Sequence, residues 1–240
     1  MIHNYMNKRI GIIIAVEAEA HAILASNKFE FEKHMSIWKS KQYPVDIILS
    51  GVGKVLASWA LMTLEASGSY SWYCSLGTSG SLGTEAIGSL YFCTEFAEWD
   101  MDIRPLGFKR GITAYENQNN PLYATMHDTL ANKIQTISGV KKKALVLSGD
   151  SFIADNSLSN ELKKDFAHDL PILVDMESAA LAKICSLRLH KPYCAFRWIT
   201  DNANKDASNN WQENVQRASE DFKTLLEHIV HATGKGLIDL

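Results

Sequence analysis

The sequence lacks any long apolar run. No stretch approaches the roughly 20 apolar residues that a membrane-spanning helix needs, so we expect no membrane association. Near the N-terminus, Lys8 and Arg9 precede a short apolar run at 10–16, an arrangement that imitates the start of a signal peptide. Glu17 and Glu19 end that run in place of a small-residue cleavage site. The sequence therefore predicts no secretion.

Cysteine is scarce, and so is charge of one sign. The four cysteines, at positions 74, 93, 185 and 194, lie in apolar segments without a CxxC pair or a histidine at metal-ligand spacing. They predict reduced core residues of a cytoplasmic protein and no metal site. The formal net charge is -3, and the one basic cluster, three lysines at 141–143, is typical of a solvated face. We expect no nucleic-acid partner.

Length and composition favour one α/β domain. A chain of 240 residues, 46% of them hydrophobic, can bury one large core, so we expect a single domain over residues 1–240. Short, nearly continuous apolar runs alternate with longer helical patterns, which predicts a largely parallel or mixed sheet flanked by helices. The expected strands are 10–15, 45–49, 72–76, 89–96, 144–147 and 193–199.

Two predicted helices differ in their surroundings. The segment 54–66 is apolar nearly all round, so its outer face is expected to meet more protein or a second subunit, which is consistent with a homodimer. A helix from about 211 to 233 has a single apolar stripe, which packing against the sheet explains. The polar segment 201–210 before it is expected to form an active-site flap.

Polar or glycine-rich loops are predicted at the ends of four strands. They are residues 17–19, 50–54, 77–81 and 200–201. Ligands of open α/β sheets bind beyond the carboxyl ends of strands, and the glycines allow backbone N–H groups to approach an oxygen-rich ligand. The GVGK segment at 51–54 lacks the length and the Ser or Thr of a Walker A loop, and no GxGxxG fingerprint is completed. Nucleoside triphosphates and dinucleotides are therefore excluded as expected ligands.

Two carboxylates flank a predicted strand-to-helix junction in the segment 174–180. Asp175 and Glu177 stand between apolar residues, and such carboxylates are seldom buried without hydroxyls or cations to bind. The alternative is a helix N-cap at Asp175 with Glu177 in the first turn, which stabilises a helix and does nothing more. Taken singly, Asp201 is also typical of a turn, Glu19 of a helix N-terminus, and Phe152 of a buried core.

Six motifs in order resemble the nucleoside phosphorylase superfamily. They are IGIIIAVEAE at 10–19, SGVGKV at 50–55, GTSG at 77–80, SGDSFI at 148–153, VDMESAA at 174–180 and RWITD at 197–201. Within the superfamily, the similarity is greatest to the methylthioadenosine/S-adenosylhomocysteine nucleosidases, which act in methionine salvage. The resemblance implies a twisted mixed central sheet flanked by helices in three α/β/α layers, closing towards a barrel. It also implies a homodimer that uses no cofactor and no metal.

The resemblance assigns roles where the residues match. Asp201 resembles the general acid that protonates the purine N7, Glu19 the residue that activates the attacking water, and Glu177 the ligand of the ribose hydroxyls. Arg197 and Thr78 resemble residues that orient these carboxylates, and Phe152 one that stacks on the base. The expected substrate-binding residues are Val16, Val52, Thr78, Ser79, Gly80, Phe152, Ile153, Asp175, Met176, Glu177, Arg197, Ile103, Leu106 and Trp211, with part of the 5′ pocket contributed by a neighbouring subunit.

Hydrolysis and phosphorolysis differ in whether the site must neutralise phosphate. Phosphorylases of the superfamily have an arginine where this chain has Ser75, and a Gly-Asp-Pro-x-x-Arg loop where it has residues 17–20. The sequence therefore favours water as nucleophile and a purine nucleosidase as the function. The alternatives are a purine nucleoside phosphorylase and a noncatalytic nucleoside-binding protein of the same fold. Departures from the nucleosidase pattern at Trp99, Arg104, Trp198 and Asn204 leave the base and the 5′ substituent open.

Overall fold

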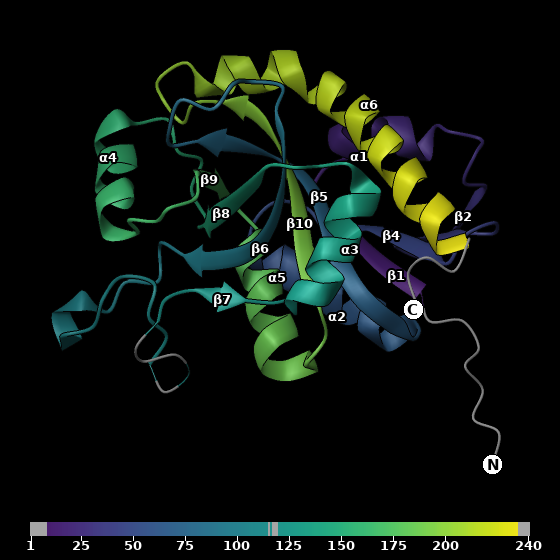
Figure 1. Ribbon diagram of the computed structural model, residues 1–240, viewed down its shortest axis with the longest axis horizontal. Coiled ribbons are helices and arrows are strands. Elements are labelled where there is room, and N and C mark those ends of the chain that lie inside the picture. The colour runs from purple at the N-terminus through teal and green to yellow at the C-terminus, as the bar shows by residue number, and fades with distance from the viewer. Residues whose placement is uncertain (1–8, 115, 117–119, 235–240) are drawn as a thin grey trace.

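The computed structural model of the chain describes residues 9–114, 116 and 120–234 and forms a mixed α/β fold (Figure 1). The strands are β1 Arg9–Ile14, β2 Phe31–His34, β3 Ile37–Ser40, β4 Val45–Leu49, β5 Tyr70–Ser81, β6 Leu90–Glu98, β7 Tyr123–Ala124, β8 Lys143–Ser148, β9 Ile172–Asp175 and β10 Tyr193–Asp201. The helices are α1 Glu17–Leu24, α2 Lys54–Ser67, α3 Asp128–Ser138, α4 Asn156–Asp165, α5 Ser178–Ile184 and α6 Ala207–Gly234, with a 3₁₀ turn at Arg104–Leu106 and a π turn at Cys185–Leu189.

One mixed sheet joins all the strands and closes partly on itself. β5 pairs with both β10 and β9, while β10, β6, β8 and β9 pair in turn, so these strands form a ring. From β5 the sheet continues through β1, β4, β3 and β2. The expectation of a twisted mixed sheet flanked by helices is confirmed.

Helices pack against both faces of this sheet. Because the central strands are covered on both sides, their sequences are near-continuous apolar runs. On one face, residues of β1, β5 and β10 pack against α1, α3 and α6. On the other face, side chains of the same strands pack against α2 and α5, and a smaller cluster lies under α4. Figure 1 shows α6 arching over one side of the sheet and α5 lying on the other.

Some boundaries differ from the sequence prediction. The prediction of a loop at 77–81 is wrong, because β5 runs on to Ser81, and Gly77 and Gly80 pair with β10 while Gly80 also pairs with β9. The long helix begins at Ala207, inside the expected flap, so the loop after β10 is shorter than 201–210. Strands β2, β3 and β7 were not predicted; β2 is largely exposed, and β7 is short. The predicted strand-to-helix junction in 174–180 is present, because β9 ends at Asp175 and α5 begins at Ser178.

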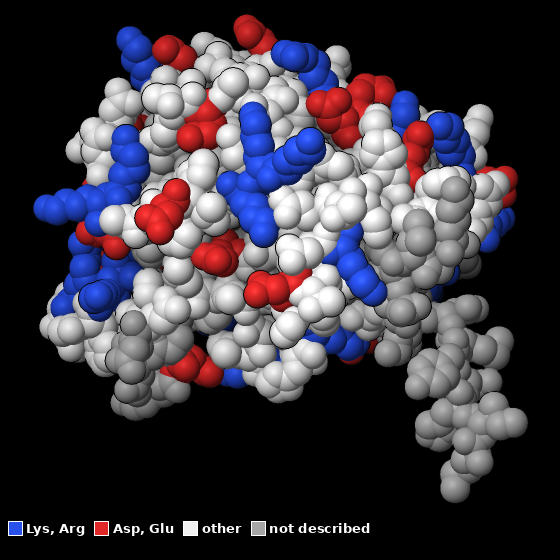
Figure 2. Space-filling view, in the orientation of Figure 1, with Lys and Arg blue, Asp and Glu red and all other residues white. Residues whose placement is uncertain are grey.

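On the face shown in Figure 2, basic and acidic side chains are interspersed. Across the described ranges, no helix is both long and apolar enough to cross a bilayer.

Candidate active site

A cavity of about 350 Å³ opens at the carboxyl ends of six strands. That volume lies within the range of small-molecule sites. β1, β4, β5, β8, β9 and β10 or the segments that follow them all contribute to its wall. The lining residues are Ala15, Val16, Glu19, Val52, Thr78, Ser79, Gly80, Ser151, Phe152, Ile153, Val174, Asp175, Met176, Glu177, Thr200, Asp201 and Trp211. Most of the residues predicted for the site are therefore brought together.

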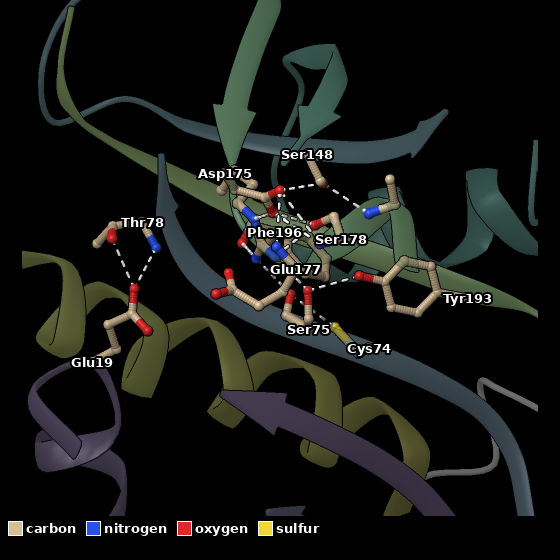
Figure 3. Close-up of polar contacts among 12 residues, drawn as sticks. Glu19, Cys74, Ser75, Thr78, Ser148, Asp175, Glu177, Ser178, Tyr193 and Phe196 are labelled. Atoms are coloured by element: carbon tan, nitrogen blue, oxygen red, sulfur yellow. Dashed lines mark hydrogen bonds and ion pairs between the residues drawn. The ribbon is translucent and has the colours of Figure 1, made fainter. Parts of the chain in front are cut away.

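Glu19 projects from the first turns of α1 and is buried. Its Oε1 accepts hydrogen bonds from the backbone N–H of Thr78 at 2.7 Å and from the Thr78 hydroxyl at 2.8 Å (Figure 3). Its Oε2 is buried and accepts no hydrogen bond from any described residue. Burial raises the pKa of Glu19 above its ordinary value, while Thr78 and the charge of Arg197 oppose this rise. One carboxylate oxygen is thus held and the other is left for a small polar molecule.

Asp201 ends β10 and is buried against β5. Its Oδ1 accepts the N–H of Ala203 at 2.9 Å, and its Oδ2 accepts the hydroxyl of Thr200 at 2.9 Å. A side chain at Gly80 would place its Cβ 2.8 Å from Asp201 Oδ1, so glycine permits this close approach. Burial raises the pKa of Asp201, which favours the protonated form that a general acid needs.

Glu177 stands at the N-cap position of α5. Its Oε1 accepts the backbone N–H of Gly53 at 2.8 Å. Gly53 adopts φ 95°, a conformation that favours glycine, and this turn aims its N–H across the cavity. Burial, and next the charge of Asp175, raise the pKa of Glu177 above its ordinary value. Glu177 is therefore a partly buried acceptor that gains from hydroxyl donors.

Asp175 of the cavity wall forms a buried ion pair with Arg197, which lies behind it. The guanidinium Nε lies 2.8 Å from Asp175 Oδ2, and Nη2 donates to the hydroxyls of Ser75 at 2.7 Å and Ser178 at 2.6 Å. Asp175 also accepts the hydroxyls of Ser148 and Ser178 and the N–H of Ser178 (Figure 3). A buried pair is stable only when its remaining groups are satisfied in this way. The alternative of an N-cap at Asp175 does not hold, because the N-cap position of α5 is Glu177. Asp175 accepts the N–H of Ser178 at the start of the helix, and both carboxylates line the cavity.

The remaining wall is largely apolar, and two of its side chains are half exposed. Val52 is 50% exposed and Phe152 is 48% exposed, while Ile153 on the same loop is buried. Trp211 in the first turns of α6 adds an indole ring whose Nε1–H donates to Thr78 Oγ1 at 2.9 Å. The lining residues Ala15, Ser151, Val174 and Thr200 were not named singly as site residues, although each lies within one of the six motifs.

Three predicted residues do not line the cavity of this chain. Arg197 lies behind it, whereas Ile103 and Leu106 belong to the segment around the 3₁₀ turn that projects from the body at the lower left of Figure 1. Leu106 is 72% exposed. A single copy of the chain therefore leaves these two side chains outside the site.

The side chains of Trp198 and Arg104, two departures from the nucleosidase pattern, do not point into the cavity. The Trp198 indole is buried on the far side of β10, where Nε1–H donates to Asp221 of α6 at 2.7 Å and Arg217 lies over the ring. The Arg104 guanidinium forms a two-point contact with Asp102 and also faces Asp165 of α4. Neither side chain lines the cavity of a single copy of the chain.

The charge of the cavity is one-sided. Its described lining contains Glu19, Asp175, Glu177 and Asp201 but no lysine or arginine. The nearest cation, Arg197, is already bonded to Asp175 and to two hydroxyls. The wall therefore suits hydroxyls, a water molecule and a base that accepts a proton, and it opposes an anion.

Comparison with known proteins finds one family, and the match extends along almost the whole chain. A family model described as the phosphorylase superfamily matches residues 9–231. The 5′-methylthioadenosine/S-adenosylhomocysteine nucleosidase of Buchnera aphidicola subsp. Acyrthosiphon pisum is 30% identical over 237 residues, which cover 92% of this chain and 99% of that protein.

Solved structures share the fold at lower identity. A Helicobacter pylori 5′-methylthioadenosine/S-adenosylhomocysteine nucleosidase mutant with 5′-methylthioadenosine in its active site matches with a TM-score of 0.82 and 21% identity, covering 94% of this chain and 99% of that chain. The futalosine hydrolase of the same species matches with a TM-score of 0.82 and 20% identity, covering 95% and 99%. Their similarity is one of fold.

Proposed function

The chain belongs to the phosphorylase superfamily and, within it, to the nucleosidase family, and from this membership we propose that it hydrolyses the N-glycosidic bond of 5′-methylthioadenosine, S-adenosylhomocysteine or a related adenine nucleoside. The products are free adenine and the free sugar, and the reaction belongs to methionine salvage.

The four cysteines are buried and unpaired, in keeping with a reduced, cytoplasmic protein.

The one-sided charge of the cavity supports hydrolysis most strongly. Phosphorolysis requires cations that neutralise phosphate, usually arginine. Among the described lining residues there is no arginine or lysine, and Arg197 has its donors engaged by Asp175, Ser75 and Ser178. An anion in this cavity would meet carboxylates without a counter-charge, whereas water meets the free Oε2 of Glu19.

In the proposed mechanism, each carboxylate has one task. The oxygen of a water molecule held at Glu19 Oε2 attacks the anomeric carbon, and Glu19 takes its proton. The N-glycosidic bond breaks, its electron pair moves to the purine, and Asp201 donates a proton to N7. Glu177 accepts hydrogen bonds from the ribose hydroxyls and stabilises the positive charge that develops on the sugar. Asp175 acts indirectly, because its oxygens are bonded to Arg197 and neighbouring serines.

A second copy of the chain completes the site in this proposal. The outer face of α2 exposes Val55, Leu56, Trp59 and Met62, an apolar surface that a monomer rarely leaves in water. This face continues from Val52, which lines the cavity. A homodimer formed here covers the half-exposed cavity wall, with Ile103 and Leu106 supplied by the partner.

Base release across a panel of nucleosides tests the proposed reaction. We expect the chain to release adenine from methylthioadenosine and S-adenosylhomocysteine, with adenosine and inosine reporting the contributions of the 5′ group and the base. Tight binding of these nucleosides without any base release would overturn the proposal in favour of a noncatalytic binding protein.

A further inference from the structure

A chain of hydrogen bonds connects α6 to the carboxylate of Glu19. The Trp211 Nε1–H donates to Thr78 Oγ1 at 2.9 Å, and the Thr78 hydroxyl lies 2.8 Å from Glu19 Oε1. An indole nitrogen only donates, whereas a hydroxyl has one proton and accepts with its lone pairs. Because Trp211 occupies a lone pair of Thr78 Oγ1, the hydroxyl proton is directed to Glu19.

We propose that Trp211 is a positioning residue for the water-activating step, acting through Thr78 to fix the orientation and proton affinity of Glu19. This inference rests on the proposed function and deepens it. The sequence pattern had placed Trp211 only as an apolar wall of the 5′ pocket. The position of its indole N–H adds a polar role that a phenylalanine, with a similar ring, does not have.

The two bonds to Glu19 Oε1 leave Oε2 as the oxygen that faces the reaction. The backbone N–H and the hydroxyl of Thr78 both donate to Oε1, whereas Oε2 is buried without a described donor. If the Thr78 hydroxyl rotated away, Oε1 would retain only the backbone N–H of Thr78 as a donor. The Glu19 side chain would then be less firmly oriented. Trp211 prevents that rotation, and it lies on the helix that follows the Asp201 loop.

The other charged groups around Glu19 do not depend on Trp211. Arg197 of β10 lies behind the cavity and lowers the pKa of Glu19, while Glu177 adds negative charge from the start of α5. Asp175 and Asp201 line the same cavity from β9 and β10, while Glu17 and His21 of α1 itself are exposed. The indole N–H is bonded to Thr78 and to none of these side chains, so replacing the indole leaves their hydrogen bonds unchanged.

A set of three variants isolates the hydrogen bond from the ring. Trp211→Phe keeps an aromatic wall without the donor, Thr78→Val removes the hydroxyl, and Thr78→Ser retains it as the control. Loss of a neutral hydrogen bond predicts a decrease in kcat of roughly threefold to tenfold in Trp211→Phe, with KM little changed. The acid limb of kcat/KM should move to higher pH, because the Thr78 hydroxyl is no longer held in place to donate to the ionised Glu19. In the Thr78→Val background, Trp211→Phe should add no further change.

The titration of Glu19 itself gives a readout that does not need activity. Carbon-13 NMR of the ligand-free protein, with the Glu19 signal assigned by its loss in Glu19→Gln, should show a higher pKa in Trp211→Phe and a parent-like pKa in Thr78→Ser. If Trp211→Phe folds poorly, benzothienylalanine at position 211 keeps the indole shape without its N–H. An unchanged Glu19 pKa, an effect confined to KM, or an equal effect in the Thr78→Val background would overturn the inference. Absence of adenine release by the parent would instead contradict the proposed function, and the NMR result would stand separately.

Discussion

At the scale of single residues, three carboxylates in one cavity have different partners. Glu19 has one oxygen bonded and one free, Asp201 has both oxygens bonded, and Glu177 accepts one backbone N–H. Burial raises the pKa of each of the three. The difference in partners, rather than the residue type, supports the assignment of base, acid and ribose ligand.

Asp201 and Glu19 can be separated by the choice of leaving group. With methylthioadenosine, Asp201→Asn should reduce kcat by roughly 10²-fold or more with little change in binding, because the amide still offers a hydrogen bond to N7 but has no acidic proton. Glu19→Gln should also be inactive. With a nitrophenyl riboside, whose leaving group needs no protonation, Asp201→Asn should lose little activity and Glu19→Gln should lose much. Equal losses on that substrate would contradict the two roles.

Glu177→Gln should weaken catalysis and strengthen the ligand-free fold. In its ionised form the Glu177 carboxylate accepts hydrogen bonds from the ribose hydroxyls in a dry site, so its loss should lower kcat/KM by an amount equivalent to several kcal/mol. Burial raises the pKa of Glu177 to about 8. The folded chain therefore holds a proton that the unfolded chain has lost between about pH 4.5 and 8, and stability decreases as the pH rises through that range. The melting temperature of the variant should exceed the parent's at pH 8, and the difference should shrink towards pH 5; a constant difference would refute this account.

At the scale of elements, the residues most predictable from sequence lie in strands buried on both faces. β1, β4 and β10 are near-continuous apolar runs, and that pattern admits few other environments. β2 and β3 were missed because their residues are partly exposed and mixed in polarity. The orientation of Trp198 was also beyond prediction, since alternate residues of a strand point to opposite faces and the sequence does not say which face has the site.

The turn at Gly53 gives an element-scale prediction with a matched control. Gly53→Ala introduces a side chain at φ 95° whose Cβ would lie 3.0 Å from Asp150 Oδ1, so the N–H that Glu177 accepts should shift. Gly139→Ala at the end of α3 has φ 73° and open space around the new Cβ. Gly139→Ala should cost about 1 kcal/mol of stability, because it forces a left-handed conformation on alanine. Gly53→Ala should cost about 1–3 kcal/mol, because φ 95° with ψ 164° is a conformation that almost only glycine adopts. Only Gly53→Ala should raise KM and lower kcat/KM in steady-state assays; a parent-like Gly53→Ala enzyme would argue against the turn's role.

At the scale of the whole molecule, the α2 face and the cavity are expected to work together. Trp59→Asp places a charge in the apolar face without touching the cavity, so it should yield monomers in sedimentation velocity and lower activity through an incomplete 5′ pocket. Met35→Lys is the control, because Met35 is 97% exposed on the turn between β2 and β3, outside α2. A fully active monomer would contradict the shared site.

The central claim is that water, not phosphate, attacks the sugar in a cavity whose described lining has four carboxylates and no cation. The most direct measurement is the rate of adenine release from methylthioadenosine in phosphate-free buffer and with added phosphate, with the sugar product identified by NMR. We predict the same rate in both conditions and free methylthioribose as the product. Release that requires phosphate and yields a sugar 1-phosphate would contradict the account.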